Sequence, residues 1–121
     1  MAVNTYVNAY RDSLGIDNVI LVDAGDCLQG DNAPYYYNYV DTASAHLFPR
    51  LAAYMKYDAI CVGNHDVETG HAVYDRVAED LKANGIPFLA GNAIRPAGTC
   101  CFMWHRFWEV SLLSTGRGSW N

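Results

Sequence analysis

Charged residues are scarce in this chain, and basic residues are scarcer than acidic ones. Asp, Glu, Lys and Arg together make up 17% of the 121 residues, and the formal net charge is −5. A basic surface that could neutralise a nucleic-acid backbone or an anionic lipid surface is therefore excluded. A phosphate-bearing substrate would also be repelled unless metal cations supplied a local positive field.

Several other patterns are missing, and each absence argues against a class of protein. No apolar run approaches the roughly 20 residues that a membrane-spanning helix needs. Residues 1–14 lack the basic start and continuous apolar core of a signal peptide. The four cysteines include no C-x-x-C pair, which disfavours a zinc knuckle or thioredoxin-like site. No G-x-G-x-x-G follows an apolar run, so a Rossmann nucleotide domain is disfavoured.

What the chain does contain predicts one α/β domain with a parallel sheet. Hydrophobic residues make up 51% of the sequence, which is too many for a disordered chain. Short apolar runs, which predict buried strands, alternate with segments of helical periodicity, and this order predicts right-handed crossovers. The expected helices are 3–14, 45–57 and 71–84, and the expected strands are 18–22, 58–62 and 86–90.

Finer expectations concern helix faces, cysteines and the end of the chain. The helix over 45–57 should place Pro49 in its first turn and should carry Leu47, Leu51, Tyr54 and Met55 on a common side. The helix over 71–84 should bury Val73, Val77 and Leu81. Residues 29–44 read as a long loop or broken helix. Cys27 and Cys61 should act as small hydrophobic residues. Residues 97–121 have no assignable pattern and are separated from a domain over 1–96.

Polar residues follow two neighbouring strands of the predicted sheet. Asp26 follows the first strand and a glycine, and Asn64, His65 and Asp66 follow the second. Ligands of parallel sheets bind beyond the carboxyl ends of the strands, so these side chains should lie at one edge. Carboxylate, carboxamide and imidazole groups can bind a borderline divalent metal such as Zn²⁺ or Mn²⁺. Each cluster alone would more often be a turn or helix cap, and it is their joint occurrence that favours a site.

These two clusters carry a resemblance to a known family. The segment V-D-A-G-D-C-L-Q-G at 22–30 resembles the second motif of calcineurin-like metallophosphoesterases, and G-N-H-D-V-E-T-G at 63–70 resembles the third. The tyrosine-rich stretch after Gly30 and the Y-D-A-I entry at 57–60 are similar to the bacterial 5′-nucleotidase and 2′,3′-cyclic-nucleotide phosphodiesterase branch. The resemblance covers about residues 1–96 and implies a layered metallophosphoesterase-type fold.

The resemblance implies a role for each matching residue. Asp26 would bridge two divalent metal ions, such as Zn or Mn, and Asn64 would bind one of them and lie near the substrate phosphate. His65 would contact the phosphate and act as general acid, while Asp66 would hold the His65 imidazole in the required tautomer. Glu68 and Gly70 would shape the loop. The substrate would be a nucleotide, and the location periplasmic or at the cell surface.

Other motifs of the family are not found in the sequence. An Asp-x-His motif should precede the first helix, and a Gly-His-x-His loop and a nucleotide-base domain should follow far downstream. His46, His71 and His105 do not stand in such contexts. The chain is therefore expected to be an N-terminal fragment of a catalytic domain, with weak metal binding and little or no hydrolysis. A missing first strand would leave an apolar sheet edge able to mediate self-association.

Two alternatives to a nucleotidase remain open. Sulfur-chain hydrolases, nucleases and protein phosphatases of the same superfamily use similar loops, although Gln29-Gly30 and the tyrosine-rich stretch favour a nucleotidase. The other alternative is a non-catalytic α/β fragment that retains part of a site.

Overall fold

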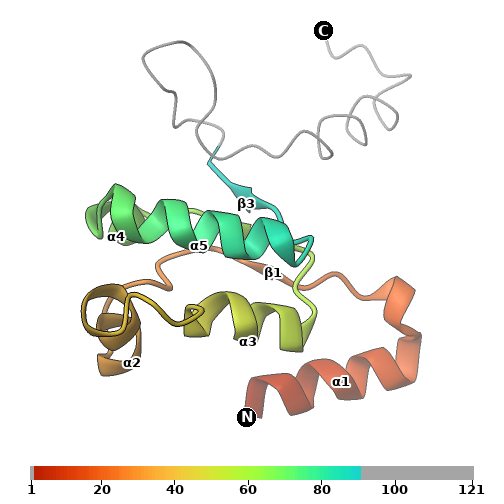
Figure 1. Ribbon diagram of the computed structural model, residues 1–121. Coiled ribbons are helices and arrows are strands. Elements are labelled where there is room, and N and C mark those ends of the chain that lie inside the picture. The colour runs from red at the N-terminus through yellow and green to blue at the C-terminus, as the bar shows by residue number, and fades with distance from the viewer. Residues whose placement is uncertain (1, 91–121) are drawn as a thin grey trace, which may run out of the picture.

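The computed structural model describes residues 2–90, which form a small sheet and the helices around it (Figure 1). The first half contains α1 (Ala2–Leu14), the 3-10 turn η1 (Ile16–Asn18), β1 (Val22–Asp23), α2 (Asn32–Tyr35) and the π-helical turn η2 (Tyr36–Val40). The second half contains α3 (Leu47–Met55), β2 (Ala59–Cys61), α4 (Asn64–Glu68), α5 (His71–Ala83) and β3 (Phe88–Leu89). The broken helix expected over 29–44 is thus present as α2 and η2.

The three strands form one parallel sheet in the order β1-β2-β3. Val22 pairs with Ala59, and Ile60 pairs with Phe88. Consecutive parallel strands require crossovers, which α2, η2 and α3 provide between β1 and β2, and α4 and α5 provide between β2 and β3. The predicted α/β class and parallel sheet are confirmed; the finer metallophosphoesterase-type layering stays a prediction.

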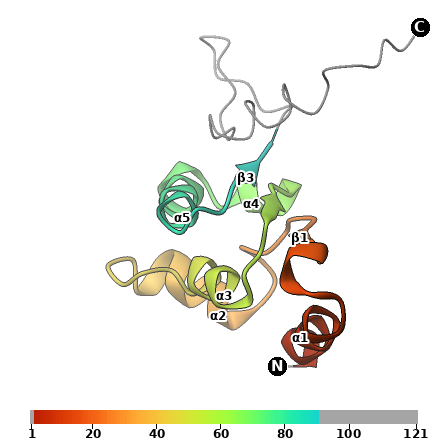
Figure 2. The ribbon, with the colours of Figure 1, turned by 90° about the vertical axis from the view of Figure 1, so that its right-hand side faces the viewer.

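The core lies between α5, α3 and the strands. Val77, Leu81 and Ile60 have no exposed side-chain surface, and Val73 and Phe88 are nearly as buried. The inward face predicted for α5 is confirmed, and so is the place of Pro49 in the first turn of α3. Figure 2 shows α3 and α5 on the same side of the strands, with α1 at the edge of the molecule away from α5.

The side of α3 that carries Leu47, Leu51, Tyr54 and Met55 is not the side that is buried. Leu51 and Tyr54 are 48% and 72% exposed, whereas Pro49 and Ala52 are buried. Ala52 belongs to the buried cluster that α3 shares with α5, and Phe48 and Ala53 pack against that cluster. Leu47 and Met55 lie between these extremes, half-buried.

The first strand is shorter and more exposed than predicted. Residues 18–22 were expected to be buried on both faces, but the strand is Val22–Asp23, with Ile20 and Val22 79% and 61% exposed. Within residues 2–90, β1 pairs only with β2 and forms the edge of the sheet. Cys61 is also exposed rather than buried. Self-association through the β1 edge stays a prediction.

The amphipathic helix predicted at the N-terminus is confirmed as α1, but most of its apolar face is exposed. Val7 is buried, whereas Tyr6 and Leu14 are 64% and 54% exposed. The helix is held by Arg11, whose guanidinium donates to the carbonyl oxygens of Met55 at 2.7 Å and Lys56 at 2.8 Å. These bonds satisfy carbonyls at the C-terminal end of α3.

None of the helices in the described part of the chain has the length and apolar character to cross a bilayer. The third strand, expected over 86–90, is shorter, at Phe88–Leu89. The proposed boundary at residue 96 and the segment 97–121 lie outside the described residues.

Candidate functional site

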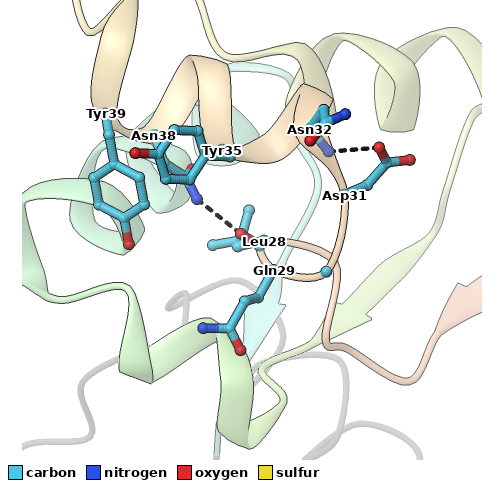
Figure 3. Close-up of a pocket in the computed structure, with 8 residues that line it drawn as sticks. Leu28, Gln29, Asp31, Asn32, Tyr35, Asn38 and Tyr39 are labelled. Carbon is cyan, nitrogen blue, oxygen red and sulfur yellow. Dashed lines mark hydrogen bonds between the residues drawn. The ribbon is translucent and has the colours of Figure 1, made fainter.

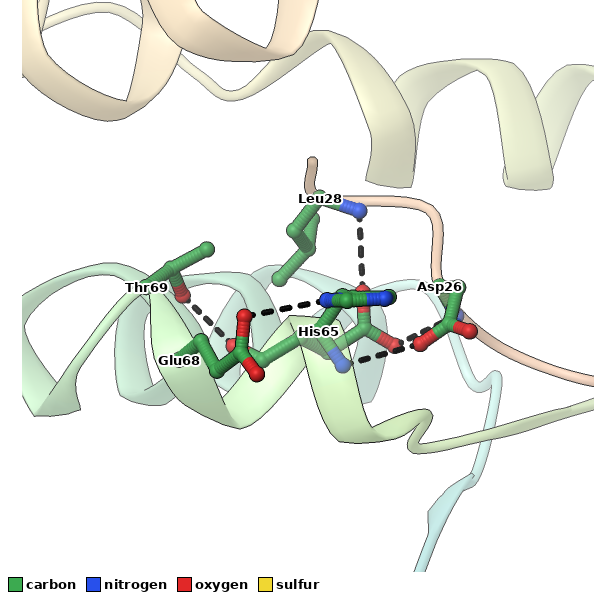
Figure 4. Close-up of polar contacts among 6 residues, drawn as sticks. Asp26, Leu28, His65, Glu68 and Thr69 are labelled. Atoms are coloured by element: carbon green, nitrogen blue, oxygen red, sulfur yellow. Dashed lines mark hydrogen bonds and ion pairs between the residues drawn. The ribbon is translucent and has the colours of Figure 1, made fainter. Parts of the chain in front are cut away.

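The two polar clusters meet where β1 and β2 end, as predicted. Asp26 lies in the loop after β1, and Asn64, His65 and Asp66 form the first turn of α4, directly after β2. The backbone N–H of His65 donates to Oδ1 of Asp26 at 2.9 Å (Figure 4). Asp26 therefore accepts a bond from the N-terminal end of α4, and its carboxylate is fixed beside that turn.

Asp66 fastens the two loops together. Its side chain is 1% exposed and accepts three backbone N–H groups: Asp26 and Gly63 donate to Oδ2 at 2.9 and 2.8 Å, and Leu28 donates to Oδ1 at 2.9 Å. A carboxylate is well suited to this position because one buried group satisfies donors from both loops. Asp66 therefore connects the loop after β1 to the first turn of α4.

The role implied for Asp66 by the resemblance is not the one its carboxylate fills. Both of its oxygens are bonded to backbone N–H groups. Nδ1 of His65 instead lies 3.0 Å from Oε2 of Glu68, three residues later on the same helix (Figure 4). Positions i and i+3 share a helix face, whereas adjacent residues do not, which explains the change of partner. The spacing alone could have identified Glu68.

The pKa of His65 is raised above its ordinary value. The hydrogen bond and then the charge of Glu68 are the main causes, and the charges of Asp26 and Asp66 add to them. Both members of the pair are about half-exposed, at 50% and 54%. The imidazole is therefore accessible to a ligand and holds its proton to a higher pH than an isolated histidine.

Replacing Glu68 should lower the pKa of His65. Glu68→Gln removes the negative charge and weakens the bond to Nδ1, so we expect the His65 ring to lose its proton at a lower pH than in the wild type. The titration of the ring by proton NMR measures this. Glu79→Gln, an exposed carboxylate on α5, is the matched control and should leave the titration unchanged. An unaltered His65 titration in Glu68→Gln would show that the pair does not form in solution.

Glycine is required where the two loops touch. A Cβ on Gly25 would lie 2.4 Å from the backbone nitrogen of Gly63, and a Cβ on Gly63 would lie 2.0 Å from Oδ1 of Asp26. Gly25 also has a φ of +98°, which side-chain-bearing residues rarely adopt. Asp26 itself is left-handed, at φ 63°. The close approach of the backbones places the Asp26 carboxylate against the start of α4.

Cys27 next to Asp26 is not a nucleophile. Its Sγ donates to Oδ1 of Asp23 at 3.2 Å, and burial together with this neighbouring carboxylate raises the pKa of the thiol to about 12. The thiol is therefore protonated at neutral pH. Asp23 also accepts the backbone N–H of Gly25 at 2.9 Å, so it shapes the turn that leads to Asp26. Sequence reasoning gave Asp23 no role, although an Asx-type turn was readable from D-A-G.

The described residues do not complete a metal site. Asp26 and Asn64 are exposed oxygen donors of suitable chemistry, but zinc sites use three or four protein ligands. Within residues 2–90 no group of three or more His, Cys, Asp or Glu side chains is placed to hold an ion. One carboxylate oxygen of Asp26 also accepts the N–H of His65, which leaves fewer lone pairs for a metal. No chemical step is therefore assigned to a metal held by these residues alone.

A cavity of about 390 Å³ adjoins the loop after β1 (Figure 3). It contains no Lys or Arg, and its lining residues are Leu28, Gln29, Gly30, Asp31, Asn32, Tyr35, Asn38 and Tyr39. The rings of Tyr35 and Tyr39 lie 5.3 Å apart and are both largely exposed. The volume falls within the range of small-molecule sites, and the lining suits an uncharged group with planar and hydrogen-bonding parts.

Among the described residues, His46 and His71 are not part of this arrangement. His71 pairs with Asp75 at the surface of α5, at 3.3 Å, and His46 is buried at the start of α3. His105 lies outside the described residues. The structure thus brings together Asp26, Asn64, His65 and Asp66 and adds Glu68 to them.

Comparison of the chain with protein-family models, curated proteins and solved structures finds no match. The resemblance to calcineurin-like metallophosphoesterases therefore stands on the two loops themselves.

Proposed function

We propose that the chain carries part of the active site of a metal-dependent phosphoesterase that hydrolyses nucleotide phosphates. One observation supports this more than any other. Asp26 and the Asn64–Asp66 turn, which resemble two motifs of that family, are fixed against each other by the bond from His65 N–H to Asp26 and by the bonds to Asp66. If Asp26 only formed a turn, no bond from its backbone N–H to the carboxylate of Asp66 in the other loop would be expected.

The proposed roles follow from the contacts of the side chains. Asp26 and Asn64 would provide oxygen ligands, and Asn64 can also donate its amide N–H to a phosphate oxygen. His65 would protonate the leaving oxygen, because Glu68 occupies Nδ1 and leaves Nε2 to face the substrate. Divalent metals, when bound, would polarise the phosphoryl group and lower the pKa of a water molecule. Water would attack phosphorus, so no covalent enzyme intermediate would form.

A nucleoside is the favoured leaving group among phosphate esters. The cavity beside Leu28 contains no cation that would bind a second phosphate. Its two exposed tyrosine rings and its side-chain amides would instead suit a nucleobase, through stacking and hydrogen bonds. The periplasm or cell surface is the proposed location on the family resemblance alone. Other hydrolases of the superfamily would share the loops but have no evident use for this cavity.

The small number of metal ligands favours a second candidate function. In this candidate the chain is a non-catalytic α/β fragment that retains part of a site. Two oxygen ligands do not compete well with water and buffer for a pair of metals. We therefore expect weak binding of Mn²⁺ or Zn²⁺ by the described site and hydrolysis that is low at best. A submicromolar two-site isotherm in calorimetric titration would contradict this expectation.

Phosphate release tests the proposal. The full chain is incubated with bis-p-nitrophenyl phosphate or 5′-AMP at micromolar and at millimolar Mn²⁺. We expect no release above the metal-only blank at micromolar metal, and slow release at millimolar metal that disappears in His65→Ala. His71→Ala is the matched control, since His71 is another exposed histidine paired with a carboxylate. Equal rates in both variants would count against the proposal, whereas no release at millimolar metal would favour the non-catalytic fragment.

A further inference from the structure

A buried hydrogen-bonded chain connects the start of α3 to the loop that carries Asp26. The Nε2 atom of His46 lies 2.9 Å from Oδ1 of Asn38. Figure 3 shows the next bond, in which Nδ2 of Asn38 donates to the carbonyl oxygen of Leu28 at 2.7 Å. His46 and Asn38 are 1% and 4% exposed, and Leu28 is fully buried. The peptide groups of Leu28 are thus held from two sides, because Asp66 accepts its N–H and Asn38 donates to its carbonyl.

The bonds of His46 fix its protonation state. Nδ1 accepts the backbone N–H of Phe48 at 3.1 Å and caps α3. Asn38 uses its amide N–H on Leu28, so its Oδ1 is an acceptor and Nε2 of His46 must be the donor. The ring is therefore neutral, with its proton on Nε2. A second proton on Nδ1 would face the Phe48 N–H and break the cap.

We propose that His46 and Asn38 are positioning residues that hold the Asp26 loop in its site geometry only while His46 is neutral. Acid would protonate Nδ1 of His46, and the cationic ring would be repelled by the Phe48 N–H that it now faces. As the ring moves away, its Nε2–H would leave Asn38, which would release the start of α3 and loosen Leu28, two residues from Asp26. The inference deepens the proposed function, on which it rests for the importance of Asp26, by assigning a pH-dependent control to that site.

The surroundings of His46 disfavour the protonated ring. Burial is the largest cause that lowers the pKa of His46 to about 4, and the positive charge of Arg76 on α5 adds to it. The charge of Asp80 on the same helix opposes them, and the ring of Tyr37 lies 5.8 Å away. The Arg76 guanidinium is held in place by the carbonyl oxygens of Tyr37 and Thr42. Stability linked to His46 is present above pH 6.5, its ordinary pKa, and is lost as the pH falls toward 4.

Two variants separate the two bonds of His46. In His46→Asn the side-chain oxygen can replace Nδ1 as the cap of Phe48, but nothing reaches Asn38. In His46→Gln the side-chain amide can replace Nε2 as donor to Asn38, but the cap is lost. Neither Asn nor Gln titrates, so the effects of both variants should be independent of pH. His46→Asn should protect the amide of Phe48 but not that of Leu28, and His46→Gln should do the reverse.

The test is amide hydrogen exchange of the full chain between pH 7 and pH 4, without metal or substrate. In the wild type we expect the protection of Leu28 to fall roughly five- to tenfold on acidification, as expected for losing one net hydrogen bond. In His46→Gln, Leu28 should stay protected at both pH values, and in His46→Asn it should be poorly protected at both while Phe48 keeps its protection.

Two outcomes would overturn the proposal. One is the same acid dependence of Leu28 protection in His46→Gln as in the wild type. The other is a wild-type His46 ring that is cationic at pH 6 by nitrogen NMR, a measurement that needs no variant to fold. Because no substrate or metal is used, failure here leaves the proposed hydrolysis standing, and failure of the phosphate-release assay leaves this result standing.

Discussion

Asp66→Ala is expected to lower the free energy of unfolding by about 3–5 kcal/mol, a large part of the stability of a domain of this size. The reason is that one buried carboxylate satisfies the backbone N–H groups of Asp26, Leu28 and Gly63. Alanine leaves all three donors without that partner in a site with little access to water. Urea unfolding followed by circular dichroism measures the change.

A graded control sharpens this prediction. Asp66→Asn can keep an oxygen at the Oδ2 position, where Asp26 and Gly63 donate, but places an amide N–H against the N–H of Leu28. Its cost should therefore lie between those of the wild type and Asp66→Ala. Glu79→Ala, on the exposed side of α5, should change stability by no more than about 0.5 kcal/mol. If Asp66→Ala were as mild as Glu79→Ala, the two loops would not depend on this carboxylate.

Gly63→Ala is expected to cost about 2–3 kcal/mol and to displace Asp26. The added Cβ would lie 2.0 Å from Oδ1 and 2.4 Å from the backbone nitrogen of Asp26, and these atoms are held by His65 and Asp66. The φ of Gly63 is −84°, which any residue adopts, so the cost comes from contact alone. Urea unfolding gives the magnitude, and the amide signal of His65 should move as its acceptor is displaced.

Gly30→Ala provides the comparison. Gly30 has a φ of +105° but no atom within 4 Å of a new Cβ, so this change tests backbone strain without a clash. It should cost about 1–2 kcal/mol and leave the His65 amide signal in place. A smaller cost for Gly63→Ala than for Gly30→Ala would mean that the loops are farther apart in solution.

The alternation of apolar runs with helical segments was enough to predict the parallel sheet and the inward face of α5. Val77 and Leu81 satisfy helical periodicity and are large, so pattern and packing agree there. On α3 they disagree, because Ala52 lies at the contact while Tyr54 faces solvent. Periodicity shows which residues share one side of a helix, but it does not show which side the neighbouring elements cover.

The sequence was enough to predict where the site lies in the fold, but not which side chains contact one another there. Strand ends located Asp26 and Asn64–Asp66 because parallel strands bring their carboxyl ends to one edge. The partner of His65 was missed, since family resemblance indicated Asp66 whereas helix geometry brings Glu68 to the imidazole. The chain through His46 and Asn38 joins residues that are distant from the loop in sequence, and no local pattern reveals it.

Titration of the full chain with Mn²⁺, followed by broadening of its amide NMR signals, tests the central claim most directly. The account predicts that signals of Asp26, Asn64 and His65 broaden first, with affinity on the order of millimolar because only two oxygen ligands are described, and that Asp26→Asn abolishes this pattern. His71 and Asp75 form an exposed pair on α5 and serve as the internal reference. Broadening that begins at His71 and Asp75, or that leaves the two loops unaffected, would contradict the assignment of this edge as a metal-dependent phosphoester site.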